Sequence, residues 1–232
     1  MIATHSGITP VPAEWRSREF LEYVERYLYT AVLSDALDEM GTRHQAMREY
    51  LRPVHAGRRF AGWARTISCE DRFEISPTPY DAEIEAVDSI LPDEVVVVST
   101  GHSTRNAPWG ELLSTAAVAR GARGVVVDGL VRDVEKIEAL GLPLFAAGVK
   151  PVDSLGRGIV TGYNEAVECG EVMVHPEDLI VGDRDGVIVV PGSMVREVTK
   201  LAADKVARED GTRAELAAGA YLRDVFQKYG VL

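Results

Sequence analysis

Strand-like and helix-like segments alternate through the middle of this chain, and no other feature of the sequence constrains the fold as much. Residues 94–99 and 124–128 are rich in valine, which is typical of buried strands. Residues 111–121 and 132–140 carry apolar side chains at three- and four-residue spacing, as helices do. With a strand at 143–146, these segments predict two consecutive β-α-β units. Right-handed crossovers would make the strands parallel.

Both predicted strand-to-helix turns carry polar groups. The first holds Gly110 and Glu111, and the second holds Arg132 and Asp133. Loops at the carboxyl ends of strands line the ligand crevice of an open α/β sheet. We therefore expect two acids, an arginine and two helix N-termini around one cleft, which predicts an anion and metal site.

These residue types suit the chemistry of a 2-oxo acid. The free amides of Glu111, Leu112 and Leu113 form a helix start suited to one carboxylate. Arg132 can bind a carboxylate in fork geometry, which lysine cannot reproduce. One carboxylate, that of Asp133, can hold Mg²⁺, since this ion keeps several waters. The metal would polarise a 2-oxo group and stabilise an enolate.

Each of these residues also has a purely structural interpretation. Acids in first helical turns, such as Glu111 and Asp133, interact favourably with the helix dipole. Arg132 on its own is typical of a surface arginine or a partner of Glu135 or Glu111. The functional interpretation rests on their shared place at one end of adjacent parallel strands.

Other catalytic motifs are absent or weak. The chain has no GxGxxG motif, no Walker A loop and no GxSxG motif. His102 lies in the loop before Gly110, where it is a proton donor, a ligand or an ordinary loop histidine. Cys69 and Cys169 form no CxxC pair, so we expect reduced thiols.

The flanking regions predict a larger α/β domain with helical ends. Residues 1–16 resemble an irregular arm, and residues 17–40 have helical spacing, with a second helix restarting at 34–35 and ending at Gly41. The basic segment 42–59 is a solvated loop or a rim facing an acidic ligand or a neighbouring subunit. The remaining predicted elements are a strand at 60–68, a helix at 80–90, short strands at 158–163, 171–174, 179–181 and 186–190 with a hairpin turn at 183–186, and helix from 192 to 232 interrupted near Gly211 and Gly219.

Charge and hydropathy limit the partners. A net charge of −11 argues against nucleic acid, whose phosphates require a basic face. The apolar runs are strand-sized, so no membrane span is expected, and the start of the chain does not resemble a secretory signal. We expect a cytoplasmic protein whose small anionic substrate depends on local cations.

At this point the sequence resembles the RraA-like family, which includes aldolases of 4-hydroxy-4-methyl-2-oxoglutarate and 4-carboxy-4-hydroxy-2-oxoadipate. The matching segments are residues 109–114, 127–133, 178–187 and 225–231. The resemblance implies a swivelling β/β/α-type single domain with helical N- and C-terminal additions. The expected boundaries are an arm over 1–16, an α/β domain over 17–191 and a helical tail over 192–232, which would pack on the domain or on a neighbouring subunit.

The resemblance implies a metal-dependent lyase that cleaves a 4-hydroxy-2-oxo acid to pyruvate and a second carbonyl compound, with oxaloacetate decarboxylation as a side activity. Asp133 would hold Mg²⁺ or Mn²⁺, and Glu111 would act through metal-bound water. Arg132 would bind the substrate with the amides of Gly110, Glu111, Leu112 and Leu113. Glu209 from a neighbouring subunit would complete the site, with Asp210 and Glu215 as competitors, in a homotrimer or a dimer of trimers.

This chain departs from the aldolase pattern at two positions. Glu111 stands where characterised aldolases often have aspartate, and Lys136 stands where an acid is common. The family also contains protein-binding regulators of a ribonuclease, and a dehydratase using the same metal-enolate chemistry is a further alternative. The long acidic tail around Glu209 favours the enzyme.

Overall fold

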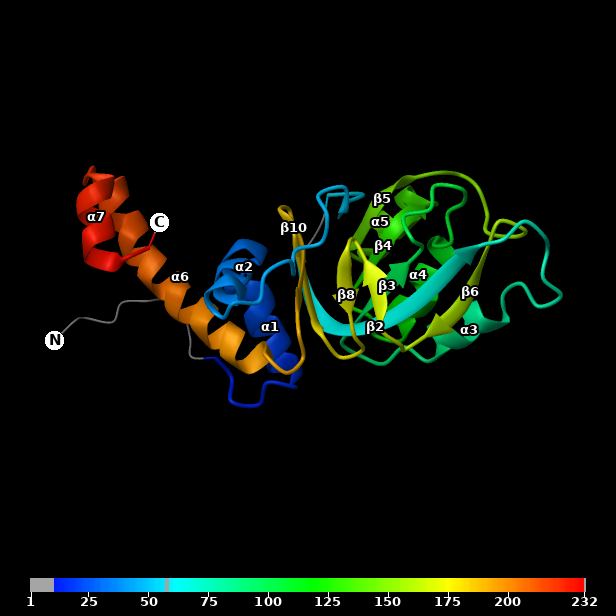
Figure 1. Ribbon diagram of the computed structural model, residues 1–232, viewed down its shortest axis with the longest axis horizontal. Helices are drawn as coiled ribbons and strands as arrows, with labels where there is room; N and C mark the ends of the chain where they lie inside the picture. Colours follow the sequence, from blue (N-terminus) through cyan, green and yellow to red (C-terminus); the bar gives the residue numbers. More distant parts are fainter. Residues whose placement is uncertain (1–10, 57–58, 232) are drawn as a thin grey trace.

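A mixed β-sheet forms the centre of the computed structural model, which describes residues 11–56 and 59–231 (Figure 1). The sheet has the order β1-β5-β4-β3-β2-β9-β10, and β6 also pairs with β2. Its strands are β1 (Arg52–Pro53), β2 (Phe60–Asp71), β3 (Glu94–Ser99), β4 (Gly124–Val131), β5 (Leu144–Val149), β6 (Gly158–Tyr163), β9 (Leu179–Asp183) and β10 (Gly186–Val190). A separate hairpin of β7 (Val167–Cys169) and β8 (Val172–Val174) lies beside it.

The predicted β-α-β units are confirmed. Strands β2, β3, β4 and β5 are parallel neighbours, connected through α3 (Asp81–Asp88), α4 (Glu111–Ala119) and α5 (Val134–Leu140). Strands β4 and β5 run to Val131 and Val149, further than predicted. A register shift between Val127 and Leu130 carries β4 past Asp128, where the predicted strand ends.

The N-terminal helices break at a different place from the predicted one. Helix α1 (Arg18–Tyr27) begins after Ser17, whose side chain accepts a hydrogen bond from the Phe20 amide, and α2 (Thr30–Glu39) begins at Thr30. The restart predicted at 34–35 is therefore wrong. The amide and hydroxyl of Thr30 both donate to the buried Asp183 carboxylate, at 2.9 and 2.7 Å, which fixes the start of α2.

The C-terminal region forms two helices, α6 (Val195–Ala217) and α7 (Leu222–Tyr229), which extend away from the sheet (Figure 1). The interruption predicted near Gly211 is wrong, because α6 continues through it. A side chain at Gly211 would stand 2.8 Å from the Tyr229 ring of α7, so the glycine permits close helix packing. The chain does turn at Gly219, where φ is +94°.

Three clusters of buried side chains form the core. One lies between α1, α2, α6 and the β9–β10 hairpin, whose predicted turn is confirmed by the pairing of Asp183 with Gly186. The second packs β3, β4 and β5 against α3, α4 and α5, and the third fills the space beneath β7 and β8. No helix in the described part of the chain is long and apolar enough to cross a membrane.

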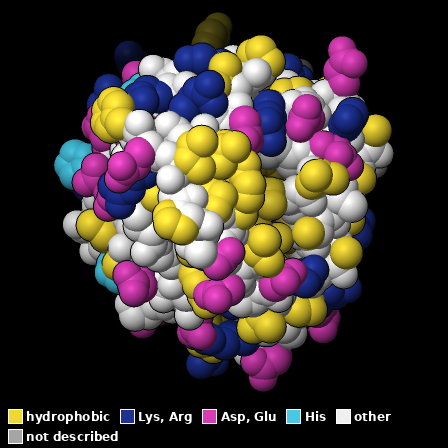
Figure 2. Space-filling model, turned by 90° about the vertical axis from the view of Figure 1, so that its right-hand side faces the viewer, with side chains coloured by type: hydrophobic (Ala, Val, Ile, Leu, Met, Phe, Trp, Pro, Cys, Tyr) yellow, Lys and Arg dark blue, Asp and Glu magenta, His cyan; other side chains and the backbone are white. Residues whose placement is uncertain are grey.

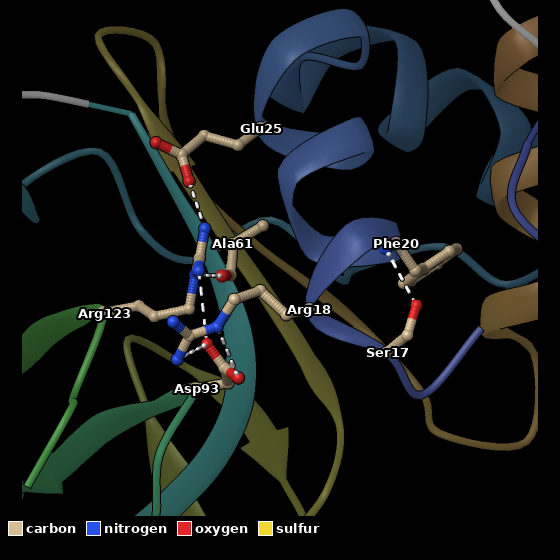
Figure 3. A network of polar contacts seen from close by, with 7 residues as sticks. All are labelled: Ser17, Arg18, Phe20, Glu25, Ala61, Asp93 and Arg123. Carbon is tan, nitrogen blue, oxygen red and sulfur yellow. Dashed lines mark hydrogen bonds and ion pairs between the residues drawn. The ribbon is translucent and has the colours of Figure 1, made fainter. Parts of the chain in front are cut away.

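A polar network fastens α1 to the sheet (Figure 3). Arg123 donates from Nη2 to Glu25 on α1 at 2.6 Å and from Nε to the Ala61 carbonyl of β2 at 2.6 Å. Asp93 accepts from Arg123 at 3.3 Å and pairs with Arg18 at 3.1 Å. The N-terminal helices are thus packed on the domain rather than separate from it. The boundaries proposed at 16/17 and 191/192 stay predictions, and residues 1–10 of the proposed arm lie outside the described residues.

Candidate active site

A pocket of about 430 Å³ opens beside the N-terminus of α4. It receives the two turns singled out in the sequence and also the loop that follows β5. Its lining residues are Tyr80, Glu83, Ile84, Pro108, Gly110, Glu111, Leu112, Leu113, Arg132, Asp133, Asp153 and Ser154. The structure therefore brings together every predicted site residue except Glu209.

Asp133 is turned away from its own helix. It occupies the N-cap position of α5 in the left-handed conformation, with φ 60° and ψ 32°, which aspartate tolerates better than most residues. Its side chain makes no capping bond to α5. Instead, its Oδ2 accepts from the Glu111 amide of α4 at 3.3 Å, and the side chain is 40% exposed. Asp133 thus lies at a helix N-terminus, as its structural interpretation expects, but its carboxylate is accessible to a ligand.

The start of α4 is shaped to receive a ligand. The N-cap residue, Gly110, has no side chain with which to cap this helix. The Glu111 amide donates to Asp133, whereas the amides of Leu112 and Leu113 are available to an anion. A Cβ at Gly110 would lie 2.9 Å from Asp133 Oδ2 and 3.2 Å from Arg132 Nε. Glycine at this position therefore permits both side chains to approach the helix start. Glu111 bonds the Thr115 hydroxyl at 3.0 Å on its own helix.

Arg132 pairs with Asp153, not with Glu135 or Glu111 as considered from the sequence. Its Nη2 lies 3.0 Å from Asp153 Oδ1, and its Nε lies 3.9 Å from Asp133 Oδ2. The Nε atom is buried and has no hydrogen-bond partner. Because this atom is closed to solvent, a ligand would meet the rest of the guanidinium, whose side chain is 38% exposed.

Two acids in the pocket, Glu83 and Asp153, escaped the sequence interpretation. Burial first, and then the neighbouring charge of Asp153, raise the pKa of Glu83 to about 7, while Arg132 opposes the shift. Burial also tends to raise the pKa of Asp153, but hydrogen bonds from Tyr80 and from the amides of Leu155 and Ser154, with the charge of Arg132, lower it below its usual value. The Tyr80 hydroxyl donates to Asp153 Oδ2 at 3.0 Å.

A signal for Asp153 was present in the sequence. It follows β5, the last strand of the two predicted β-α-β units, so the rule that found Arg132 and Asp133 applies to it as well. The predicted strand ended at Ala146 rather than Val149, which hid the relation. Glu83 lies on α3 with no comparable signal, because only the packing of α3 beside α4 brings it to the pocket.

The donor atoms in the pocket limit the kind of metal ion that it could hold. Within residues 11–56 and 59–231, no three His, Cys, Asp or Glu side chains converge as a metal cluster. A closed thiolate or imidazole site therefore does not fit this pocket. Mg²⁺ and Mn²⁺ accept a single carboxylate plus waters and substrate oxygens, and Asp133 offers that carboxylate. The partly exposed guanidinium of Arg132 beside it could bind the carboxylate of the same ligand.

The remaining sequence candidates lie elsewhere in the chain. Glu209 on α6 accepts a hydrogen bond from the Tyr29 hydroxyl and does not line the pocket of its own chain. Its competitors are also engaged, Asp210 with Arg213 and Glu215 with Lys228. His102 stacks near Tyr50, with its Nδ1 3.1 Å from the Asp128 carbonyl oxygen, and is not among the pocket residues.

Several known proteins are similar to this chain in sequence. Residues 30–189 match the model of the RraA-like family, described as Aldolase/RraA. A putative 4-hydroxy-4-methyl-2-oxoglutarate aldolase from Halalkalibacterium halodurans is 31% identical over 79% of this chain and 84% of its own length. An uncharacterised protein from Methanocaldococcus jannaschii is 42% identical over 51% of this chain, and the match spans only 57% of that relative.

A solved structure extends the likeness to three dimensions. RraAS2 of Streptomyces coelicolor, an unusual member of the RNase ES inhibitor RraA protein family, has a TM-score of 0.77 and 27% identity. The match covers 86% of this chain and 98% of that one, which confirms the predicted fold class. With the family model matching well over half of its length, this chain belongs to the RraA-like family.

Proposed function

We propose that the protein is a divalent-metal-dependent carbon–carbon lyase that cleaves a 4-hydroxy-2-oxo acid to pyruvate and a second carbonyl compound. The observation that carries this proposal is the convergence of Arg132, Asp133 and the uncapped start of α4 in one pocket. The name of the Halalkalibacterium halodurans relative, a putative aldolase, supports the same reaction class.

The chain supplies a binding site for the pyruvyl end of the substrate. The substrate carboxylate would accept hydrogen bonds from the Arg132 guanidinium and from the amides of Leu112 and Leu113. The Arg132 side chain is 38% exposed, and the N-cap residue Gly110 has no side chain to bind those amides. A carboxylate held this way sets the 2-oxo group beside Asp133, because Asp133 Oδ2 lies 3.9 Å from Arg132 Nε.

Asp133 would hold Mg²⁺ or Mn²⁺ directly, and Glu111 would act through a bound water. When bound, the cation would polarise the 2-oxo group and stabilise the enolate left by cleavage. Glu111 stands at the first turn of α4, where its carboxylate can take up the proton of the C4 hydroxyl through that water. Oxaloacetate decarboxylation would leave the same enolate, so we expect it as a side activity.

The proposed assembly is a homotrimer or hexamer with sites at subunit boundaries. Support comes from the projecting pair α6 and α7, which carries the acids Glu209, Asp210 and Glu215 away from the sheet (Figure 1). Tyr221 just before α7 and Phe226 on α7 are 80% and 46% accessible and give this pair an apolar surface for a neighbour. Glu209 remains our candidate for the acid that reaches a neighbouring pocket.

The direct test is pyruvate release from several 4-hydroxy-2-oxo acids and oxaloacetate, measured with Mg²⁺, with Mn²⁺ and with EDTA. We expect metal-dependent release that EDTA abolishes. Asp133→Ala should remove the activity without unfolding the protein, since its carboxylate is solvent-accessible. Glu135→Ala, an exposed acid two positions along the same helix, is the matched control and should retain activity. Full activity in Asp133→Ala would contradict the assignment.

A second candidate function is a non-catalytic regulator of a ribonuclease. The likeness to RraAS2 favours it. The same assay separates the two, because a regulator releases no pyruvate with either metal and binds its ribonuclease equally well with Asp133→Ala. Loss of water from the substrate without pyruvate release, detected by mass spectrometry, would instead indicate a dehydratase.

A further inference from the structure

The pocket carries an unbalanced set of charges. Among its described lining residues, Arg132 is the one cation, and the acids are Glu83, Glu111, Asp133 and Asp153. Arg132 and the start of α4 are needed for the carboxylate at C1 of a 2-oxo acid. A bound divalent cation would be held by Asp133 and the C1 end of the same ligand. With Arg132, the helix start and the cation all engaged at the C1 end, no positive group among the described lining residues remains for the other end of the substrate.

The wall that remains for the C4 end is acidic and apolar. It consists of Glu83 and Ile84 from α3, Tyr80 just before that helix, and Asp153 and Ser154 from the loop after β5. The charge of Asp153 is already paired with Arg132 at 3.0 Å and bonded by Tyr80. Glu83 has no hydrogen bond to any described residue, so its carboxyl is free to meet the ligand.

The entrance to this wall is hydrophobic. Ile84 and Leu112 line the pocket and are 53% and 77% exposed. The face of the molecule shown in Figure 2 gathers hydrophobic side chains, with acidic and basic ones around them. An uncharged group on C4 would bury apolar surface here. Above a pH of about 7, where Glu83 is ionised, a second carboxylate would lose its hydration beside a like charge with no cation in return, which weakens its binding.

Building on the proposed function, we infer that the pocket selects 4-hydroxy-2-oxo monocarboxylates with an uncharged substituent on C4, and that Glu83 is the specificity-determining residue that excludes a second carboxylate. The relatives named as 4-hydroxy-4-methyl-2-oxoglutarate aldolases carry a dicarboxylic acid in their names. This chain would therefore differ from those names in its substrate while sharing the reaction.

Binding can be tested separately from catalysis with two ligands that cannot be cleaved. 2-Oxopentanoate and 2-oxoglutarate have equal chain length and differ by a methyl group in place of a carboxylate. Calorimetry with the Mg²⁺-loaded protein at pH 8.5, where Glu83 is ionised, should show 2-oxopentanoate binding at least about tenfold more tightly. The matching substrates, 4-hydroxy-2-oxopentanoate and 4-hydroxy-2-oxoglutarate, should show the same order in kcat/KM for pyruvate release.

Substitutions at Glu83 test the assigned residue. Glu83→Gln keeps the size and removes the charge, so it should bring the two affinities closer together, mainly by strengthening 2-oxoglutarate binding. Glu83→Arg should reverse the order, and Glu83→Gln remains informative if that variant does not fold. Glu85→Gln, an exposed position on the same helix outside the pocket lining, is the control and should keep the wild-type ratio.

The outcomes separate this inference from the proposed function. Cleavage of both substrates with the dicarboxylate equal or preferred would overturn the inference and leave the lyase intact. A wild-type preference for the monocarboxylate that Glu83→Gln leaves unchanged would overturn the role of Glu83. Failure to bind or cleave any member of either pair would overturn the proposed function, and the inference with it.

Discussion

Among single residues, Arg132 is our proposed donor to the substrate carboxylate. Asp153 holds its Nη2 at 3.0 Å, and the side chain remains 38% exposed to a ligand. Arg132→Lys keeps the charge but loses the second donor of the fork. We expect kcat/KM for pyruvate release to fall by at least about tenfold, with kcat falling too if the arginine steadies the enolate. An unchanged kcat/KM would make the residue structural.

The raised pKa of Glu83 predicts that the stability of the folded protein depends on pH. Its folded-state pKa, about 7, lies above the usual value of 4.5, so the folded protein retains a proton that the unfolded chain has lost. Stability should therefore fall as pH rises from about 4.5 to about 7, and the cost persists above that range. Glu83→Gln should be more stable than wild type at pH 8, by at most roughly 3 kcal/mol, and nearly equal to it at pH 4.5.

Urea unfolding in EDTA at both pH values measures this difference. Glu85→Gln on the exposed side of α3 should follow the wild-type curve. A pH-independent difference between Glu83→Gln and wild type would show that the effect comes from packing and not from ionisation.

The distance of each pocket residue from a clear strand signal explains which of them could be predicted from the sequence. Arg132 and Asp133 follow a valine-rich strand directly, so the strand-end rule places them without knowledge of packing. Asp153 obeys the same rule but follows a strand whose penultimate residue, Gly148, is of a type depleted in strands. Glu83 depends on how α3 sits against α4, which is tertiary information.

At the scale of elements, the turn from β3 into α4 determines the site through Gly110. Its φ of −149° is available to any residue, so Gly110→Ala strains no backbone. The added methyl would meet Asp133 Oδ2 at 2.9 Å and Arg132 Cγ at 3.1 Å and would push both side chains aside.

We therefore expect Gly110→Ala to lower kcat/KM by at least about tenfold while the unfolding midpoint changes little. Pyruvate release and thermal unfolding of the same sample measure the two effects. A large loss of stability, or full activity, would show that Gly110 is not needed to position these side chains.

The element boundaries that the sequence misplaced were set by tertiary contacts. The start of α2 at Thr30 is fixed by Asp183, which lies far along the chain. Gly211 reads as a helix breaker, yet it lies within α6 because the Tyr229 ring fills the space beside it. The apolar periodicity that located α4 and β3 is a local signal, so those elements were predicted closely.

For the whole molecule, we expect active sites that are shared between neighbouring subunits. The pocket holds no residue of α6 or α7, and these helices project from the body (Figure 1). Glu209→Gln and Asp133→Ala should each be nearly inactive, and mixed oligomers should recover part of the activity at boundaries that hold both intact groups. Asp210→Asn and Glu215→Gln in the same experiment identify the acid if Glu209 is not the one. An active monomer would contradict shared sites.

Enolate formation in this pocket can be measured without knowing the natural substrate. A lyase that releases pyruvate also binds pyruvate, and reversible formation of its enolate exchanges the methyl protons with solvent. Proton NMR of pyruvate in D₂O with the Mg²⁺-loaded protein should show loss of the methyl signal well above the rate with Mg²⁺ alone. EDTA and Asp133→Ala should each return the rate to background. Exchange at the background rate with the loaded wild-type protein would contradict the account.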